Sequence, residues 1–522
     1  MNKIVLSTIA ALTIGTVSLS AMQFYVDDKG QVFIHPAANR TALDMSDMKE
    51  TTKKVQMSEA EKKKIRAEIK EEVLAEVKTQ KEAMKKDILA DIKKDSILPS
   101  IKRITIMDED SPEFLLGKQT KINMKFIADD NPEMWLKAGV RIQGTMESKE
   151  IDYQGSGKEE TDEQDAYLRR VRLEIAAGFG HGISYTMDIR NDKSNYGIEN
   201  DEGKFSVGDA YVKIKKPFDT SLINFKLYRA KIDVSRTETV KSARVIAYDR
   251  PYVADVAAQY ISFNRRGANI QMYGDWEKKV HYQVAFGSAT SPDKIKDATG
   301  GKMSSAAEVK DQSFFYGGKL VLSPFDGWEE TQRTETYFGK GKHFEIGAGY
   351  WNVPSMEGTV TTNNTDIDYD LNHQLINLEA SMHYKGLFLQ GEYFKFKDAV
   401  QSWEHNDDGT PLTSSDKLNT GDASGWYVTG EYVMPEYGYI APFARYESFD
   451  MFEKAGDAKV TSLQAGLNWY LKGNTIKAGI YYQKDSFGED AADNHIKDGA
   501  GNITRSYEKE VQYIRLTSQF FF

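Results

Sequence analysis

The chain of 522 residues is 40% hydrophobic and 28% charged, and its mean hydropathy of -0.55 leaves only one N-terminal stretch apolar enough for a membrane helix. This excludes a helical channel or transporter, and 28 Tyr, 25 Phe and 7 Trp exclude a disordered or collagen-like chain. The absence of Cys excludes disulfides and thiolate chemistry, and the net charge of -10 argues against nucleic acid as a partner.

The first 21 residues are typical of a secretory signal. A basic Met1-Asn2-Lys3 leads into an uncharged run that ends on the small residues Ser18 to Ala21. We expect a signal peptide over residues 1–21 that is cleaved on export; the alternative is an uncleaved anchor helix.

Two elements and a linker are expected before the main domain. Residues 22–56 contain an alternating pattern around Asp27-Asp28-Lys29-Gly30, which indicates a short hairpin followed by a linker. Residues 57–98 carry apolar side chains at helical spacing and predict one amphipathic helix, interpreted as a self-associating periplasmic coiled coil or as a solitary helix on the barrel. Residues 99–133 are expected to be a linker.

From residue 134 to residue 522 the apolar pattern changes to a period of two, which is typical of β-strands with one face in lipid. Each segment has about the length of a tilted membrane strand. Sixteen strands are expected, beginning near Met134, Ala166, Gly182, Phe205, Leu222, Gly267, Lys279, Ser313, His343, His373, Leu387, Ser424, Gly438, Lys459, Thr475 and Glu510.

Short connections alternate with long polar ones, as in a barrel with tight periplasmic turns and long outer loops. Residues 324–342 break this rule, because a short turn is expected there and the connection is long. The chain ends on the aromatic Phe522, which resembles the signal recognised by outer-membrane assembly machinery. The fold class is therefore an all-β transmembrane barrel of about 16 antiparallel strands with an N-terminal helical segment, in the outer membrane of a Gram-negative-type cell.

The alternation also predicts which side chains face the lumen. Lipid must contact Val171, Leu173 and Ile175, so their neighbours Arg170, Arg172 and Glu174 point inward, and Arg169 needs a bulge or an interfacial position. Over the first five strands the same rule predicts a basic wall, with Lys137, Arg141, Arg170, Arg172, Arg190, Lys213, Arg229 and Lys231 inside against Glu174, Asp188 and Asp209.

The longest connection, residues 234–266, is net basic and too apolar for a solvated loop. We expect it to fold into the barrel and narrow it, the alternative being a packed extracellular cap. Converging guanidinium groups at such a constriction favour anions.

Three segments resemble the phosphate-selective porins O and P: residues 166–179 (AYLRRVRLEIAAGF), 208–212 (GDAYV) and 225–250 (FKLYRAKIDVSRTETVKSARVIAYDR). The resemblance implies a trimer of sixteen-stranded barrels that carries anions past arginines to a narrow site of Arg, Lys, Ser and Asp. The matching positions are Arg169, Arg170, Asp209, Ser242, Arg244 and Arg250, and Arg141, Arg172, Arg229 and Lys241 join them as expected pore-lining residues. One departure is AKIDV at residues 230–234, where the family tends to have a Phe-x-x-Pro-Phe turn.

The sequence therefore predicts a passive porin for small anions, with phosphate and other oxyanions as candidate solutes, that works as a homotrimer without cofactor or metal. The rivals are a general-diffusion porin, or an envelope tether or surface-binding protein anchored by the barrel, with peptidoglycan or periplasmic contact through the helix. Enzymatic activity is not expected, because His343, His373 and His383 form no catalytic motif.

Overall fold

The computed structural model describes most of the barrel and three short strands near the N-terminus. The described residues are 25–27, 32–33, 40–42, 101–105, 124–128, 133–154, 159–194, 205–262, 265–292, 295, 308–325, 334–338, 342–362, 365–404, 410–454, 457–488 and 507–521. The chain divides into two units, residues 1–99 and residues 100–522. The expected signal peptide and the amphipathic helix of residues 57–98 lie outside the described residues.

In the first unit, β1 (Tyr25–Asp27) pairs antiparallel with β2 (Val32–Phe33), within the segment where a short hairpin is expected. A third strand, β3 (Arg40–Ala42), pairs with the other edge of β1.

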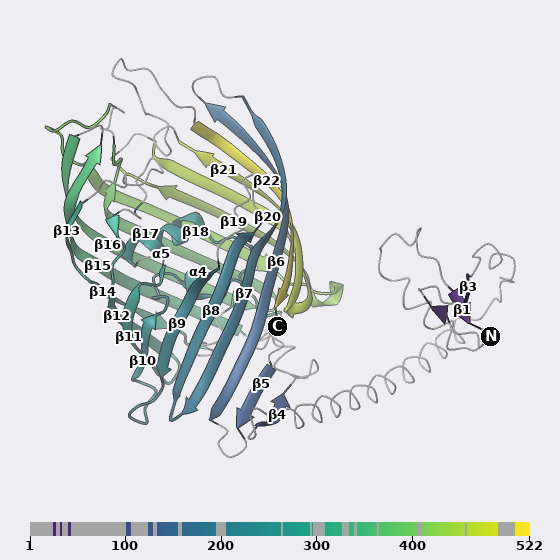
Figure 1. The fold of residues 1–522 in the computed structure, drawn as a ribbon. Coiled ribbons are helices and arrows are strands. Elements are labelled where there is room, and N and C mark those ends of the chain that lie inside the picture. Colours follow the sequence, from purple (N-terminus) through teal and green to yellow (C-terminus); the bar gives the residue numbers. More distant parts are fainter. Residues whose placement is uncertain are drawn as a thin grey trace. The chain divides into compact units, whose positions relative to one another are not determined.

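The second unit is a closed antiparallel barrel whose wall has 16 strands, as the alternation predicts (Figure 1). Each wall strand pairs with the next along the chain, and the last closes on the first. The wall strands are β6 (Met134–Gln154), β7 (Thr161–Gly180), β8 (Ile183–Ser194), β9 (Ser206–Ile214), β10 (Asn224–Arg229), β11 (Ala268–Trp276), β12 (Val280–Gly287), β14 (Phe315–Leu322), β15 (Lys342–Thr362), β16 (Thr365–Tyr384), β17 (Leu387–Val400), β18 (Thr420–Tyr432), β19 (Ile440–Asp450), β20 (Lys459–Asn474), β21 (Ile476–Phe487) and β22 (Tyr507–Phe521).

Three short strands extend this sheet. β4 (Ile101–Thr105) and β5 (Met124–Ala128) lie within the segment expected to be a linker, and β5 pairs with the first residues of β6. β13 (Glu308–Gln312) pairs with the outer part of β15. None of the described helices has the length and hydropathy that a membrane-spanning helix needs.

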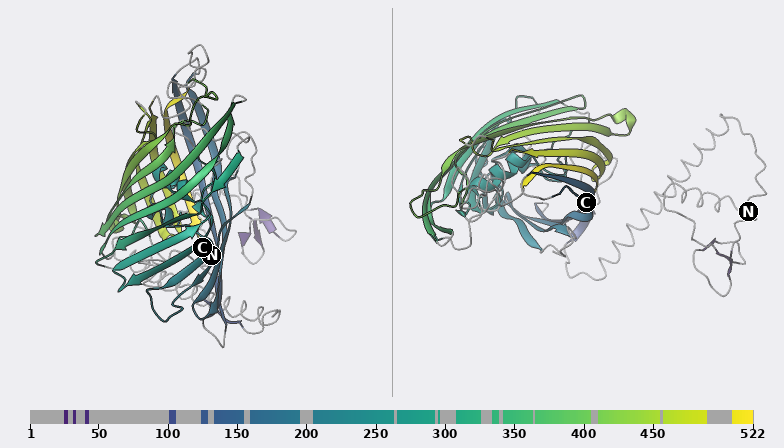
Figure 2. Two further views of the ribbon diagram at one scale, coloured as in Figure 1. Left: turned by 90° about the vertical axis from the view of Figure 1, so that its left-hand side faces the viewer. Right: turned by 90° about the horizontal axis from the view of Figure 1, so that it is seen from above.

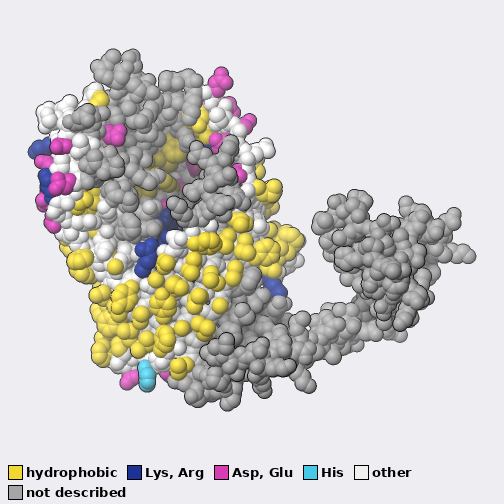
Figure 3. All heavy atoms as spheres, in the orientation of Figure 1, with side chains coloured by type: hydrophobic (Ala, Val, Ile, Leu, Met, Phe, Trp, Pro, Cys, Tyr) yellow, Lys and Arg dark blue, Asp and Glu magenta, His cyan; other side chains and the backbone are white. Residues whose placement is uncertain are grey.

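Alternating exposure along the strands separates lipid from lumen. In β16, Ile376, Leu378 and Met382 are exposed on the outside, whereas Asn377 and Glu379 between them are buried inside. On the face that Figure 3 shows, hydrophobic side chains form a band across the barrel, with most charged side chains above it. Polar groups inside and apolar groups outside are what a membrane barrel with a filled or wet lumen requires.

Tight turns join the strands at one end, the periplasmic end in barrels of this kind. Gly182 in the β7–β8 turn has a φ of 73°, and a Cβ there would lie 2.2 Å from the Lys215 carbonyl oxygen. Only glycine fits this turn. A 3-10 turn, Pro435–Tyr437, joins β18 to β19 at the same end.

The connection from β10 to β11, residues 230–267, lies inside the barrel (Figure 2, right). We call it the constriction loop. It contains α4 (Arg236–Thr239) and α5 (Tyr252–Ile261), and α5 packs on an apolar cluster inside β14 to β20. Members of this cluster include Val253, Ala257, Ile261, Trp351, Leu375, Phe396 and Tyr427. The prediction that this loop folds inward is confirmed, and the extracellular cap is excluded.

Candidate functional site: a basic constriction inside the barrel

Carboxylates of the barrel wall hold the N-termini of both loop helices. Glu392 of β17 accepts hydrogen bonds from the backbone amides of Arg236 (3.0 Å) and Thr237 (3.1 Å) at the start of α4. Glu447 of β19 accepts one from the amide of Val253 (3.4 Å) in the first turn of α5. Free amides and the helix dipole favour an anion at these points, so the wall fixes where each helix begins.

Between the helices, the loop runs along the wall formed by β6, β20, β21 and β22. The Arg141 guanidinium donates to Ser242 Oγ (2.6 Å), and Gln519 Nε2 donates to the Ala243 carbonyl (3.0 Å). Lys477 Nζ donates to the Val245 carbonyl (2.8 Å). The loop thus has a defined path across the lumen rather than a loose one.

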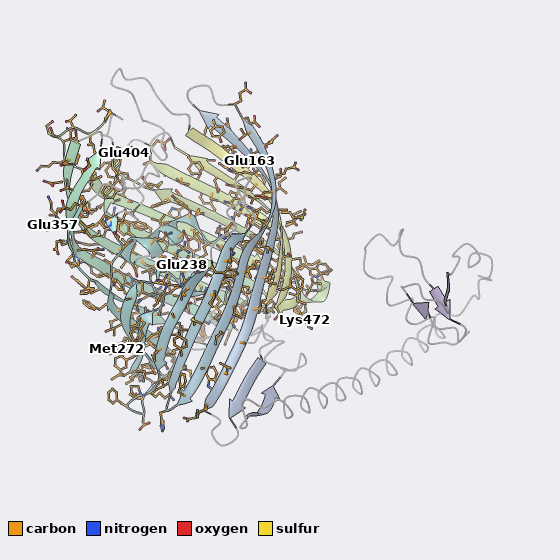
Figure 4. The ribbon with its side chains drawn as sticks, viewed as in Figure 1. Glu163, Glu238, Met272, Glu357, Glu404 and Lys472 are labelled. Atoms are coloured by element: carbon orange, nitrogen blue, oxygen red, sulfur yellow. The ribbon has the colours of Figure 1, made fainter. Side chains whose placement is uncertain are left out.

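Glu238 of α4 is the centre of a cation cluster on the loop. It is 1% exposed, and its carboxylate lies 3.1 Å from Lys231 Nζ, 3.3 Å from Arg250 Nε and 3.6 Å from Arg265 Nη1. Burial alone would raise the pKa of Glu238, but Arg250, Lys231 and Arg265 hold it well below its usual range. In Figure 4, Glu238 lies at mid-height of the barrel, below Glu163 and above Met272.

A second carboxylate, Asp249, is shared among arginines of the barrel wall. It is 2.7 Å from Arg169, 3.9 Å from Arg170 and 3.6 Å from Arg515. Burial opposes ionisation of Asp249, but these arginines, Arg169 first, keep its pKa well below the usual range. One carboxylate therefore serves three arginines from β7 and β22.

A row of arginines crosses three neighbouring strands of the wall. Arg141 of β6 is directly opposite Arg172 of β7, and Arg172 is directly opposite Arg190 of β8. Directly paired residues share a face of the sheet, and like charges in such pairs are unfavourable. Glu174 forms ion pairs with Arg141 and, at 3.0 Å, with Lys241 of the loop. The wall thus holds a costly concentration of positive charge opposite the loop.

These charged groups border a cavity of about 630 Å³ inside the barrel. Its lining combines arginines of the wall and the loop with a smaller number of acids and tyrosines, namely Arg169, Arg170, Arg172, Arg190, Arg250, Arg265, Arg266, Arg445, Arg515, Lys231, Glu147, Glu447, Asp249, Asp255, Asp485, Tyr167, Tyr252 and Tyr513.

The ten residues expected from the sequence take different positions around this space. Arg169 and Arg170 both reach the lumen because a register shift between Gln143 and Gly144 leaves β7 with one extra residue; this bulge is one of the two alternatives expected for Arg169. Asp209 pairs with Arg266 at 2.5 Å. Arg172 lines the cavity, and Lys241 remains 46% exposed.

The remaining expected residues mainly bind protein groups. Arg141 and Ser242 bind each other, and the Arg244 carbonyl accepts from the Glu335 amide. Arg250 donates to the carbonyls of Thr237 (2.9 Å) and Val240 (2.8 Å), and Arg229 donates to the Gly208 carbonyl (2.8 Å). Arg250 therefore stabilises the backbone of the loop in addition to giving the loop positive charge.

Two groups were missed from the sequence. Arg515 points inward, because its neighbours Ile514 and Leu516 are exposed to lipid. The alternation of apolar and polar residues in the last strand is the sequence signal that could have identified it. Residues 334–338 enter the lumen, and the only signal was the unusual length of their connection. Among the described residues, three exposed acids at the outer rim, Glu150, Glu160 and Asp162, are close enough to share a metal ion, but exposed carboxylates commonly cluster without one.

Residues 140–486 match the model of the family described as phosphate-selective porin O and P. The chain belongs to this family. An uncharacterized protein of Aquifex aeolicus (strain VF5) is 25% identical over 397 residues, which cover 70% of this chain and 85% of that protein.

Solved barrels are similar at low sequence identity. The outer membrane channel DcaP of Acinetobacter baumannii has a TM-score of 0.47 at 10% identity, covering 76% of this chain and 99% of that one. The anion-selective porin from Comamonas acidovorans has a TM-score of 0.44 at 10% identity, covering 74% and 99%. Family and barrel together make this porin an outer-membrane channel.

Proposed function

We propose that this porin is a passive channel that prefers small anions, phosphate and other oxyanions among them, and that selection occurs where the constriction loop faces the arginine row. The observation that supports this most directly is the sharing of carboxylates: Glu238 and Asp249 each serve three cations. Asp255 and Glu147 also pair with Arg265 and Arg515, yet the cavity lining still holds ten cationic side chains against five acids, so the constriction keeps an excess of positive charge.

Guanidinium groups suit this task because they stay charged and can replace part of the hydration shell of an oxyanion in bidentate fashion. Conduction also needs weak binding at several points in series. Arg172, Lys241 and the cavity arginines offer such a series from the outer end to the loop. No residue needs to perform chemistry, and solutes move down their gradients.

The nearest alternative is a general-diffusion porin. Glu174, Asp209 and Asp249 favour this alternative, because their carboxylates neutralise part of the positive charge of the wall and the loop. We further propose that the barrel assembles as a homotrimer, as its family resemblance implies, after export by the cleaved signal peptide expected over residues 1–21.

The deciding measurement is the reversal potential of the purified porin in a planar bilayer under a potassium chloride gradient, repeated with added phosphate. Anion preference with block by phosphate supports the proposal. Arg172→Glu should reduce the anion-to-cation permeability ratio by about tenfold, equivalent to about 1.4 kcal/mol. Lys278→Glu makes the same change of charge in an exposed turn and should leave the ratio unchanged. A wild-type potential near zero, or of cation sign, would contradict the proposal.

A further inference from the structure

One periplasmic connection departs from the short turns beside it. Between β14 and β15, residues 334–338 fold into the barrel and are buried, with exposed fractions from 1% for Thr336 to 8% for Tyr337. We call these five residues the inner turn.

The inner turn binds the constriction loop through Glu335. One carboxylate oxygen accepts from Thr237 Oγ1 (2.7 Å) and the other from the Ile246 amide (2.8 Å). The Glu335 amide donates to the Arg244 carbonyl (3.2 Å), and Arg236 donates to the Thr334 carbonyl (2.9 Å).

Aromatic residues fix the inner turn to the wall. The Tyr337 ring stacks on His343 of β15 at 5.3 Å and on His383 of β16 at 4.8 Å between centroids. Phe338 packs edge-on against Tyr470 of β20 at 5.1 Å. Its φ of 53° is unusual for a bulky residue, and such a backbone persists only where surrounding contacts hold it.

The positions that Glu335 joins explain what it does. Thr237 and Ile246 lie at the two ends of the loop stretch that carries Glu238, Lys241 and Ser242, so one carboxylate closes the base of this stretch. Apolar side chains would suffice for packing alone. A buried carboxylate that uses both oxygens on the loop instead fixes the spacing of these ends.

We propose that the inner turn clamps the constriction loop from the periplasmic side, and that Glu335 is a positioning residue that sets the width of the pore. This inference builds on the proposed channel function but does not depend on which ion the channel prefers. Without the clamp, the stretch between Thr237 and Ile246 should move away from its place on the wall.

The test uses a reporter cysteine, because the natural chain has none. Ala247→Cys places a thiol at a position that is 3% exposed beside the clamp. Its rate of reaction with a methanethiosulfonate reagent added on the periplasmic side should rise at least tenfold when Glu335→Ala is added. Glu335→Gln, which keeps one acceptor oxygen, and Thr237→Val, which removes one donor, should give smaller increases.

Glu436→Gln is the matched control, because it removes an exposed acid from another periplasmic turn and should not change the rate. Single-channel records should show larger or noisier open currents for Glu335→Ala and not for the control. Folding is checked by heat-modifiable gel mobility; if Glu335→Ala fails to fold, Glu335→Gln and Thr237→Val decide.

Rates and currents within twofold of wild type in folded Glu335 variants would overturn the clamp. Loss of anion preference in the wild type would overturn the proposed function and leave the labelling result intact, so the two failures can be told apart.

Discussion

Lys231 and Glu238 show how single residues set the charge of the constriction. Both lie on the constriction loop, and they form an ion pair of 3.1 Å that Arg250 and Arg265 join. Burial first, and the neighbouring Arg250 next, lower the pKa of Lys231 well below that of a free lysine. The neighbouring cations lower the pKa of the Glu238 carboxyl despite its burial, so Glu238 stays ionised. The positive charge of the cluster therefore depends on Lys231 more than on any change at Glu238.

This difference predicts a pH dependence on the alkaline side. The ordinary pKa of a lysine is about 10.4. A lysine with a lowered pKa therefore loses its proton, and hence its positive charge, at a lower pH than that. The anion preference of the wild type should therefore fall with rising pH at pH values below about 10.4, as measured by reversal potential. Lys231→Arg keeps the charge over this range and should flatten the profile. An equal decline in Lys231→Arg would place the titrating group elsewhere.

At the scale of elements, β7 shows how one extra residue changes what a strand can present. Its bulge lies at Arg169, so Arg169 and Arg170 both reach Asp249 while Leu168 and Leu173 remain exposed on the lipid face. Without the bulge, strict alternation would direct one of the two arginines into lipid, at a cost of about 2–4 kcal/mol near the midplane.

Two single-residue deletions in β7 should therefore differ in outcome. Deleting Arg169 removes the extra residue and restores regular pairing, so the barrel should assemble and show heat-modifiable mobility like the wild type. Deleting Arg172 reverses the parity of everything after it and directs Glu174 toward lipid, so assembly should fail. If both variants assemble, or if neither does, the bulge is not the reason why β7 accepts the loss of one residue.

The same element shows what a sequence can predict. Alternation in β7 was enough to predict its faces, because the period of two reports which side of a strand meets lipid, and it marked Arg169 as a position that needs a bulge or an interfacial location. It could not predict the inner turn, because Glu335 binds Thr237 and Ile246, which lie 98 and 89 positions away. Such contacts join irregular segments that have no period. The inward fold of the constriction loop could be expected only from its apolar content.

For the whole barrel, the apolar cluster around α5 and the row of arginines occupy different parts of the lumen. The cluster around α5 fills the interior of β14 to β20 with buried groups such as Trp351, Phe396 and Trp403. The arginine row lies on β6 to β8, and the cavity borders it. We therefore expect solute to pass along the arginine row, where the cavity lies.

All the barrel strands that the structure describes lie within residues 100–522, a different unit from residues 1–99. Deleting residues 57–95, the core of the expected amphipathic helix, should therefore leave single-channel conductance and reversal potential unchanged. The control is the full-length porin purified in the same way. If the chain instead serves as an envelope tether, the deletion should weaken the attachment of the outer membrane in cells, measured as release of outer-membrane vesicles. A loss of conductance from a barrel that still shows heat-modifiable mobility would mean that the N-terminal unit takes part in the pore.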